Sequence, residues 1–205
     1  MGNNTSQSRF SRSQDIRSYK KVVHIFPEGK KTEPRYFNGL NKLCKNVRLE
    51  IHSCRKKTSA VQVLTLAQEF IANGIITLRK GDEAWLVVDV DNNKKEDLEL
   101  LFRWSEESER YGFALSNPKF EIWLLQHFEL GDAIQSVSEC DARLMRHLEN
   151  YTKAGFNVAK FLDKIPNAIS NAEIKYKHCN DWFYDFHTTV FRLVKRILDL
   201  EKEVI

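Results

Sequence analysis

Four short apolar runs, separated by stretches with helical spacing, constrain the fold of this chain more than any other feature. The runs cover residues 22–26, 47–51, 84–88 and 112–115. The first run is almost wholly apolar, as a strand buried on both faces of a sheet must be. Strands that alternate with helices predict a parallel sheet with helices on both faces. We therefore expect an α/β (Rossmannoid) fold built on a sheet of about four mainly parallel strands.

Helix signals stand between and after these runs. Thr32 is a typical N-cap for the helix that follows the first strand. Asn93 and Glu96 form a plausible capping pair for a helix that ends near residue 110. Beyond about residue 130 the pattern is helical throughout, and an amphipathic helix near 188–203 ends it. The two threonines Thr188 and Thr189 are interpreted as capping residues of that last helix.

With 205 residues, the chain is long enough for one domain with a small addition. We expect a flexible basic tail over 1–20, an α/β domain over 21–130, and a helical C-terminal extension over 131–205 that packs on the same domain as a cap. No apolar run is long enough to cross a membrane, and no signal peptide is visible, so we expect a cytoplasmic protein. The four cysteines form no CxxC pair, so no zinc site is expected.

Charge is distributed unevenly along the chain. Residues 1–81 carry 16 basic and 5 acidic groups, whereas residues 82–150 carry 7 basic and 16 acidic groups. The basic part could meet phosphates, and the acidic part could hold a divalent cation. Both could equally be solvated surfaces, so charge alone does not decide the function.

Three carboxylates stand where predicted strands end. Glu28 follows the first strand, and Asp89 and Asp91 follow the third. In an open parallel sheet, binding sites lie beyond the C-terminal ends of the strands. If the first and third strands are neighbours, these carboxylates converge and could share a Mg²⁺ ion, which prefers oxygen ligands. The alternative for each residue is an ordinary turn or cap.

A second dense segment, SNPKFEIWLLQHF, covers residues 116–128. Ser116, Asn117 and Glu121 should lie near the same sheet edge as the carboxylates. A helix that opens at this point would present backbone N–H groups to an anion. His127 is interpreted either as a structural histidine or as a general acid.

In combination these motifs resemble the RloB/AbiL-type proteins of bacterial phage defence, which carry a Toprim-like domain. The matching segments are EGKKTEPRYF (28–37), VDVD (88–91), SNPKFEIWLLQHF (116–128), YTK (151–153) and HTTVFRLV (187–194). A DxD after a strand is also found in haloacid-dehalogenase-type phosphotransferases. Those proteins usually carry DxDxT or DxDxV on the first strand, whereas here the motif follows the third strand and Asn93 occupies the fifth position.

The resemblance implies a Toprim-like fold in which Glu28, Asp89 and Asp91 are the catalytic and metal-binding residues. The implied activity is a Mg²⁺-dependent nuclease (a hydrolase, with Mn²⁺ as an alternative ion) that serves as an antiviral, abortive-infection effector. The implied partners are nucleic acid, with RNA such as transfer RNA favoured over DNA, and an ABC-type ATPase; a homo-oligomer is also compatible. Candidate phosphate-binding residues are Lys30, Lys119 and Lys153, and candidate supporting residues are Gly29, Thr32, Glu33, Ser116, Asn117, Glu121 and His127.

Two other functions remain open at this stage. The domain could be a non-catalytic Toprim-like module that binds the ATPase or nucleic acid. It could also catalyse another metal-dependent phosphotransfer, such as nucleotidyl transfer to a small substrate.

Overall fold

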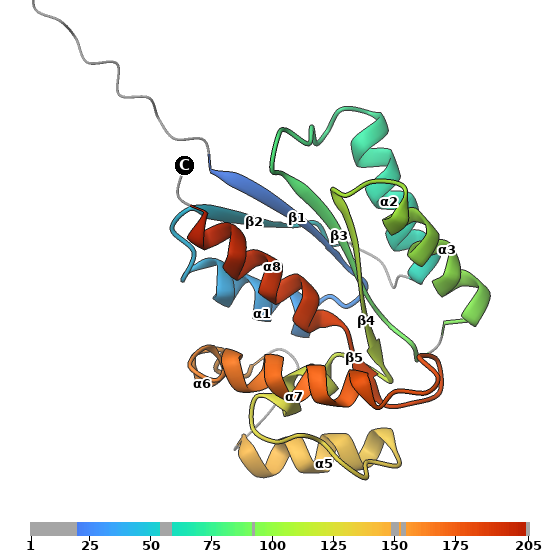
Figure 1. The fold of residues 1–205 in the computed structure, drawn as a ribbon, viewed down its shortest axis with the longest axis vertical. Coiled ribbons are helices and arrows are strands. Elements are labelled where there is room, and N and C mark those ends of the chain that lie inside the picture. Colours follow the sequence, from blue (N-terminus) through green and yellow to red (C-terminus); the bar gives the residue numbers. More distant parts are fainter. Residues whose placement is uncertain (1–19, 54–58, 92, 149–151, 153–154, 204–205) are drawn as a thin grey trace, which may run out of the picture.

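A single mixed sheet organises the chain (Figure 1). The computed structural model describes residues 20–53, 59–91, 93–148, 152 and 155–203. Within these residues the sheet has five strands in the order β2-β1-β3-β4-β5. The strands are β1 (Lys21–Pro27), β2 (Val47–Ile51), β3 (Glu83–Asp89), β4 (Tyr111–Asn117) and β5 (His187–Thr188). The first four are mutually parallel, and β5 is antiparallel to β4.

The four apolar runs form the four parallel strands, so the expected α/β class is confirmed and is consistent with a Rossmann-like fold. Every residue of β1 after Lys21 is buried, because helices cover both faces of this central strand. β2 lies at the sheet edge and alternates between buried and more exposed positions. The first and third strands are direct neighbours, which is the arrangement that the carboxylate prediction required.

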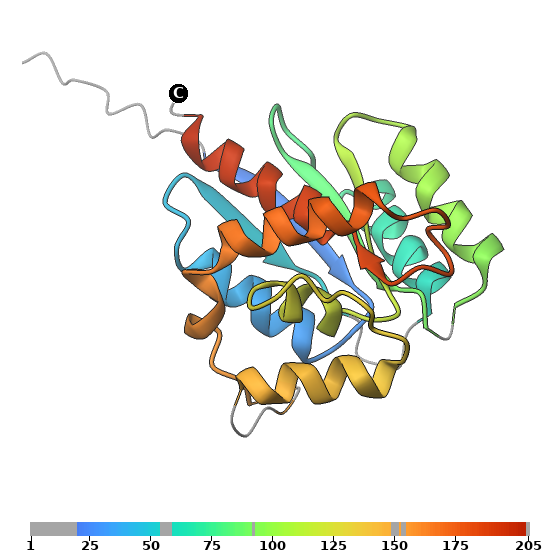
Figure 2. The same cartoon turned by 60° about the horizontal axis from the view of Figure 1, so that its bottom comes forward.

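Helices cover both faces of the sheet (Figures 1 and 2). α2 (Ala60–Ala72) and α3 (Lys95–Glu106) pack on one face, where their apolar side chains join Phe26, Leu86 and Val88 in one core. α1 (Thr32–Asn41) and α8 (Val190–Lys202) pack on the other face. The remaining helices extend that second layer: α4 (Glu121–Gln126), α5 (Val137–His147), α6 (Ala159–Leu162) and α7 (Ile165–Lys177).

The second core joins the strands to the C-terminal helices. It includes Val23 and Ile25 of β1 together with Trp123 of α4 and Leu193 and Ile197 of α8, and all five are fully buried. α8 has the strongly one-sided apolar pattern expected of it, and its buried residues occur three and four apart. The C-terminal helices are therefore continuous with the core of the sheet.

The last part of the chain departs from the helical expectation. Residues His187 and Thr188 form β5, which extends the sheet to a fifth strand. Thr188 is thus a strand residue, although its Oγ1 also accepts a hydrogen bond from Val190 N at 3.1 Å. Thr189 precedes α8, but its Oγ1 accepts from Leu115 N at 2.9 Å instead of capping the helix. These threonines bind the free edge of β4.

Three local expectations were wrong. Thr32 is the first residue of α1 and not its cap, because Lys31 occupies the cap position. Asn93 and Glu96 do not cap α3, which begins at Lys95 after Lys94. The helix expected from Pro118 begins only at Glu121 and has six residues, all buried.

Two predicted features lie outside the described residues: positions 1–19 of the expected tail and the candidate phosphate ligand Lys153. Among the residues that are described, none of the helices combines the length and apolar character needed to span a membrane.

Candidate carboxylate site

The C-terminal ends of β1 and β3 bring Glu28 and Asp89 together. Glu28 N donates to Val87 O at 2.9 Å, and Asp89 N donates to Glu28 Oε2 at 3.2 Å. The backbone at Asp91 is bonded to the end of β4: Val90 N donates to Ser116 O, and Asp91 N donates to Pro118 O just after the strand. The backbone on both sides of the DxD segment is therefore fixed by its neighbours in the sheet.

A cavity of about 390 Å³ opens at this edge of the sheet. Five carboxylates and three lysines line it, which leaves a formal excess of two negative charges when all are ionised. Its lining consists of Glu28, Gly29, Lys30, Lys31, Thr32, Glu33, Asp89, Asp91, Lys119 and Glu121. Nine of the thirteen residues predicted for the site, Gly29 and Thr32 among them, thus line one cavity.

Asn93 fixes the carboxylate of Glu28. Its Nδ2 donates to Glu28 Oε1 at 3.1 Å, to Glu28 Oε2 at 3.0 Å and to Asp89 O at 2.9 Å. Its Oδ1 accepts from Ala60 N at 3.0 Å, so the same side chain also joins the start of α2 to the site. Burial raises the pKa of Glu28, although the hydrogen bonds from Asn93 and Asp89 oppose that shift.

Asp89 is the most constrained acid of the group. Its Oδ1 is fully enclosed and has no hydrogen-bond partner within the described part of the chain. Burial raises the pKa of Asp89 well above its usual value, and the nearby charges of Glu33, Asp91, Glu121 and Glu28 raise it further. An enclosed carboxylate oxygen without a donor costs free energy unless a proton or a cation satisfies it.

The turn after β1 places Glu33 against the site. Glu33 and Thr32 are buried in the first turn of α1. A Cβ atom at position 29 would overlap the carboxylate of Glu33, so any other residue there would have to displace that carboxylate. Gly29 therefore supports the position of Glu33 beside Asp89.

The lysines of the cavity differ in their surroundings. Lys119 is 6% exposed, and its Nζ donates to Asp141 Oδ2 of α5 at 2.7 Å. Lys30 and Lys31 are exposed at the rim. Lys119 was predicted as a phosphate ligand, but its ammonium group already has a carboxylate partner from a distant segment.

Ser116 and Asn117 end β4, but their side chains bond to β5 and to the segment before it. Ser116 Oγ lies 3.1 Å from Thr188 Oγ1, and Asn117 Nδ2 donates to Phe183 O at 2.7 Å. Ser116 is the register partner of Asp89 in β4. These two residues therefore position the end of β4 and do not line the cavity.

His127 lies in the hydrophobic core and not at the cavity. Its Nε2 is 3.2 Å from Tyr36 Oη and its Nδ1 is 2.9 Å from Trp123 O. Burial lowers the pKa of His127 to about 4, so the ring is neutral at pH 7. This geometry favours the structural interpretation over the general acid.

Two backbone N–H groups at the start of α4 already donate to carbonyl oxygens of the protein. Ile122 N donates to Lys119 O and Trp123 N donates to Phe120 O, both at 3.0 Å. The helix is also short and buried throughout. Two of the N–H groups at this turn are therefore already bonded within the protein.

A family model described as RloB-like protein matches residues 23–197. The chain belongs to the RloB-like protein family. The match includes β1, β3 and β4 and all of the cavity residues from Glu28 to Glu121. No curated protein matches the chain, and neither does any solved structure.

The donor set of this RloB-like protein fits a divalent cation with oxygen ligands. The enclosed Oδ1 of Asp89 has no donor among the residues that the structure describes, and four other carboxylates surround it. Glu28, Asp89 and Asp91 do not all lie within 4.8 Å of one another, since the one described group that meets this limit is elsewhere. Mg²⁺ is usually bound through one or two carboxylates and several waters, so it does not require all three side chains at bonding distance.

Two members of the site were not predicted from the sequence of this RloB-like protein. Asn93 was assigned to a helix cap, and the only signal for its role was its position two residues after Asp91. Asp141 gave no signal, because it reaches Lys119 from α5 across 22 residues of chain.

A larger cavity of about 990 Å³ lies elsewhere on the RloB-like chain, and its walls include Trp85, Tyr111 and Trp182. It contains none of the convergent acids described above. The site is assigned to the smaller cavity because reactive side chains gather there with altered proton affinities.

Proposed function

We propose that this RloB-like protein is a Mg²⁺-dependent Toprim-type nuclease that acts as the effector of a bacterial anti-phage, abortive-infection system. RNA such as transfer RNA is the favoured substrate, and an ABC-type ATPase is the proposed controlling partner. The observation that carries the proposal is the enclosed, unpartnered Oδ1 of Asp89 at the end of β3, surrounded by four further carboxylates.

The charge of the cavity supports a metal-dependent reaction on phosphates. With an excess of two negative charges, the cavity by itself repels a phosphodiester. Asp89 and Asp91, assisted by Glu28, would hold Mg²⁺ or Mn²⁺ there. A bound cation would supply Lewis-acid stabilisation of the charge that develops on the phosphoryl oxygens.

The residues of the chain itself supply orientation and proton transfer in this proposal. Lys30 and Lys31 at the rim would contact the phosphates that flank the scissile bond. Glu28 is the candidate general base or acid. Its raised pKa brings it nearer to neutrality, and Asn93 fixes the direction of its oxygens.

The second candidate is a non-catalytic module that binds the ATPase or nucleic acid. It is favoured by one observation: both oxygens of Glu28 already accept hydrogen bonds from within the protein. A purely structural Glu28 would have the same contacts.

A paired cleavage assay separates the candidates. Wild type, Asp89→Asn and a matched exposed control, Asp163→Asn, are induced with the neighbouring ATPase gene, with and without phage. Total RNA and DNA are then examined on gels. We expect fragmentation with wild type and Asp163→Asn, and a loss of at least about 100-fold with Asp89→Asn.

The same purified proteins are assayed with labelled RNA and DNA in Mg²⁺ and in chelator. Cleavage that persists in Asp89→Asn or in chelator contradicts the nuclease proposal. Equal phage protection by all three proteins, with intact nucleic acid, supports the binding module. Nucleotide incorporation without strand scission supports a nucleotidyl transferase.

A further inference from the structure

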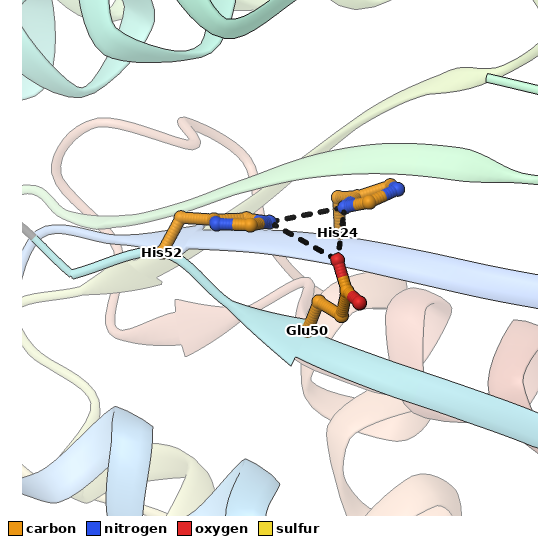
Figure 3. A group of neighbouring side chains, drawn as sticks. All are labelled: His24, Glu50 and His52. Carbon is orange, nitrogen blue, oxygen red and sulfur yellow. Dashed lines mark hydrogen bonds and ion pairs between the residues drawn. The ribbon is translucent and has the colours of Figure 1, made fainter. Parts of the chain in front are cut away.

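A second group of potential metal ligands lies on β1 and β2, apart from the carboxylate cavity. It consists of His24, Glu50 and His52, and Figure 3 shows the three side chains turned toward one another. Among the described residues it is the one set of three His, Cys, Asp or Glu side chains whose ligand atoms all lie within 4.8 Å. None of the three lines the carboxylate cavity.

The register of the sheet creates this group. His24 of β1 and Glu50 of β2 are direct partners across the parallel pair, so their side chains share one face. His52 lies two residues after Glu50, and its backbone N donates to Ile25 O at 2.8 Å, which continues the ladder. The two-residue repeat of an extended chain therefore returns His52 to the same face.

The distances between the donor atoms match those of a small tetrahedral site. His24 Nδ1 is 3.0 Å from His52 Nε2 and 3.3 Å from Glu50 Oε2, and His52 Nε2 is 4.0 Å from Glu50 Oε2. Zn²⁺ binds histidine nitrogen and carboxylate oxygen at about 2.0–2.2 Å, so the ligands of a tetrahedron stand about 3.3–3.6 Å apart. Shifts of a few tenths of an ångström would bring all three atoms to bonding distance.

The surroundings of both imidazole rings favour the neutral form, which can bind a cation. Burial lowers the pKa of His24, and burial together with His24 lowers the pKa of His52 to about 4. Both imidazoles are therefore neutral at pH 7, which is the form that binds metal. Since the facing nitrogens are 3.0 Å apart, one of them donates the proton that the other accepts when no cation is bound.

Neighbouring side chains hold the ligands in place. Arg48 Nη2 pairs with Glu50 Oε1, which leaves Oε2 directed at the histidines. Phe26 stacks on His52 with ring centroids 4.8 Å apart, and Phe70 meets the edge of the same ring. Such support around the ligands is typical of metal sites, where outer contacts orient the binding groups.

We propose that His24 Nδ1, His52 Nε2 and Glu50 Oε2 form a Zn²⁺ site that joins the edge strand β2 to β1. Water would complete the coordination. Imidazole ligands favour Zn²⁺ over Mg²⁺, so this site and the oxygen-only carboxylate site select different ions. The inference does not depend on the proposed nuclease activity.

The test uses the full chain after removal of metal with a chelator. Zn²⁺ is titrated against a colorimetric competitor, and Co²⁺ is used as a spectroscopic probe of tetrahedral nitrogen and oxygen ligation. The variants are His52→Ala and Glu50→Gln, with His178→Ala as a control at an exposed histidine. Thermal unfolding with and without Zn²⁺ is recorded for each protein, to confirm that all four are folded.

We expect one Zn²⁺ per wild-type chain and a melting temperature that Zn²⁺ raises. His52→Ala and Glu50→Gln should weaken this binding by at least about 100-fold, since changes in outer contacts alone cost about 10- to 100-fold. His178→Ala should bind as wild type does. Equal Zn²⁺ affinity in wild type and His52→Ala, or no tetrahedral Co²⁺ spectrum in wild type, overturns the proposal.

Discussion

Replacing Asp89 by asparagine should stabilise the metal-free protein while it removes the proposed activity. The carboxylate oxygen Oδ1 is enclosed without a donor and is surrounded by other acids. Asparagine has nearly the same shape, carries no charge and could donate its amide N–H groups to those acids. Leaving a buried polar group unsatisfied costs about 1–3 kcal/mol, so Asp89→Asn should raise the free energy of unfolding by about that amount.

For a chain of this length, 1 kcal/mol corresponds to about 2–4 °C, so the expected increase in melting temperature is roughly 2–12 °C. The measurement is thermal unfolding by circular dichroism at pH 7 in chelator, with Asp163→Asn as the control at an exposed aspartate. Mg²⁺ at 100 times its dissociation constant should then stabilise wild type by about 2.7 kcal/mol and Asp89→Asn by much less.

The pH dependence gives a second check on the same variant. The folded-state pKa of Asp89 is raised, so the folded protein binds this proton more tightly than the unfolded chain does. Ionisation of Asp89 therefore lowers the free energy of unfolding. This loss is absent below the unfolded pKa of about 3.9 and grows as the pH rises toward the folded pKa. The difference in the free energy of unfolding between Asp89→Asn and wild type should therefore shrink as the pH falls toward 4. A variant that melts at or below the wild-type temperature in chelator at pH 7 would refute this reasoning.

Three further predictions concern the supports of the site and the core. Asn93→Ala removes hydrogen bonds that lower the pKa of Glu28. The acidic limb of the pH–rate profile for cleavage should therefore move to higher pH. An unchanged limb argues against Glu28 as the base. Gly29→Ala should displace the carboxylate of Glu33 and weaken Mg²⁺ binding measured by calorimetry, with Asp163→Asn as the control at an exposed position; equal affinity in both variants contradicts the contact. The folded-state pKa of His127 is lowered to about 4 from 6.5, so its contribution to stability is complete above pH 6.5 and is lost as the pH falls toward 4, by roughly 3 kcal/mol. His127→Gln should flatten the acid side of the denaturant-measured stability curve over that interval, and an unchanged slope counts against the neutral buried ring.

The parallel strands could be predicted from short runs rich in apolar residues: β1 and β3 are almost wholly apolar, as burial on both faces demands, and the edge strand β2 alternates. β5 could not be predicted from its two residues, His187 and Thr188, since neither is apolar enough to mark a strand. It exists because the end of β4 presents an unpaired edge: Ser116 and Asn117 are its register partners, and the Ser116 hydroxyl also contacts Thr188 Oγ1. That pairing depends on contacts made across 70 or more residues of chain.

The carboxylates could be predicted for a similar reason. Glu28 and Asp89 follow strands that turn out to be neighbours, and parallel strands end at one edge. Asn93 was misassigned because an asparagine three residues before a glutamate also fits a capping box. Its true partner, Glu28, belongs to another strand, and no local pattern encodes that choice.

The group formed by His24, Glu50 and His52 also depends on contacts between strands that no local sequence pattern encodes. The expectation of no zinc site considered only cysteine spacing, and this group contains no cysteine. His24 and Glu50 are 26 residues apart, and only the β1–β2 register places them opposite each other. A sequence pattern for such a site therefore requires the strand pairing to be known first.

The pairing of β4 with β5 has a consequence for how the protein is made. The strand end that holds Asp89 and Asp91 pairs with β4, and β4 pairs with residues 187–189, about 70 residues later in the sequence. A polypeptide is synthesised from its N-terminus, so these contacts can form only after residues 187–189 have left the ribosome. The carboxylate cluster thus reaches its final geometry well after its own acidic residues are made, and a chain interrupted before residue 187 carries those acids without the contacts that position them.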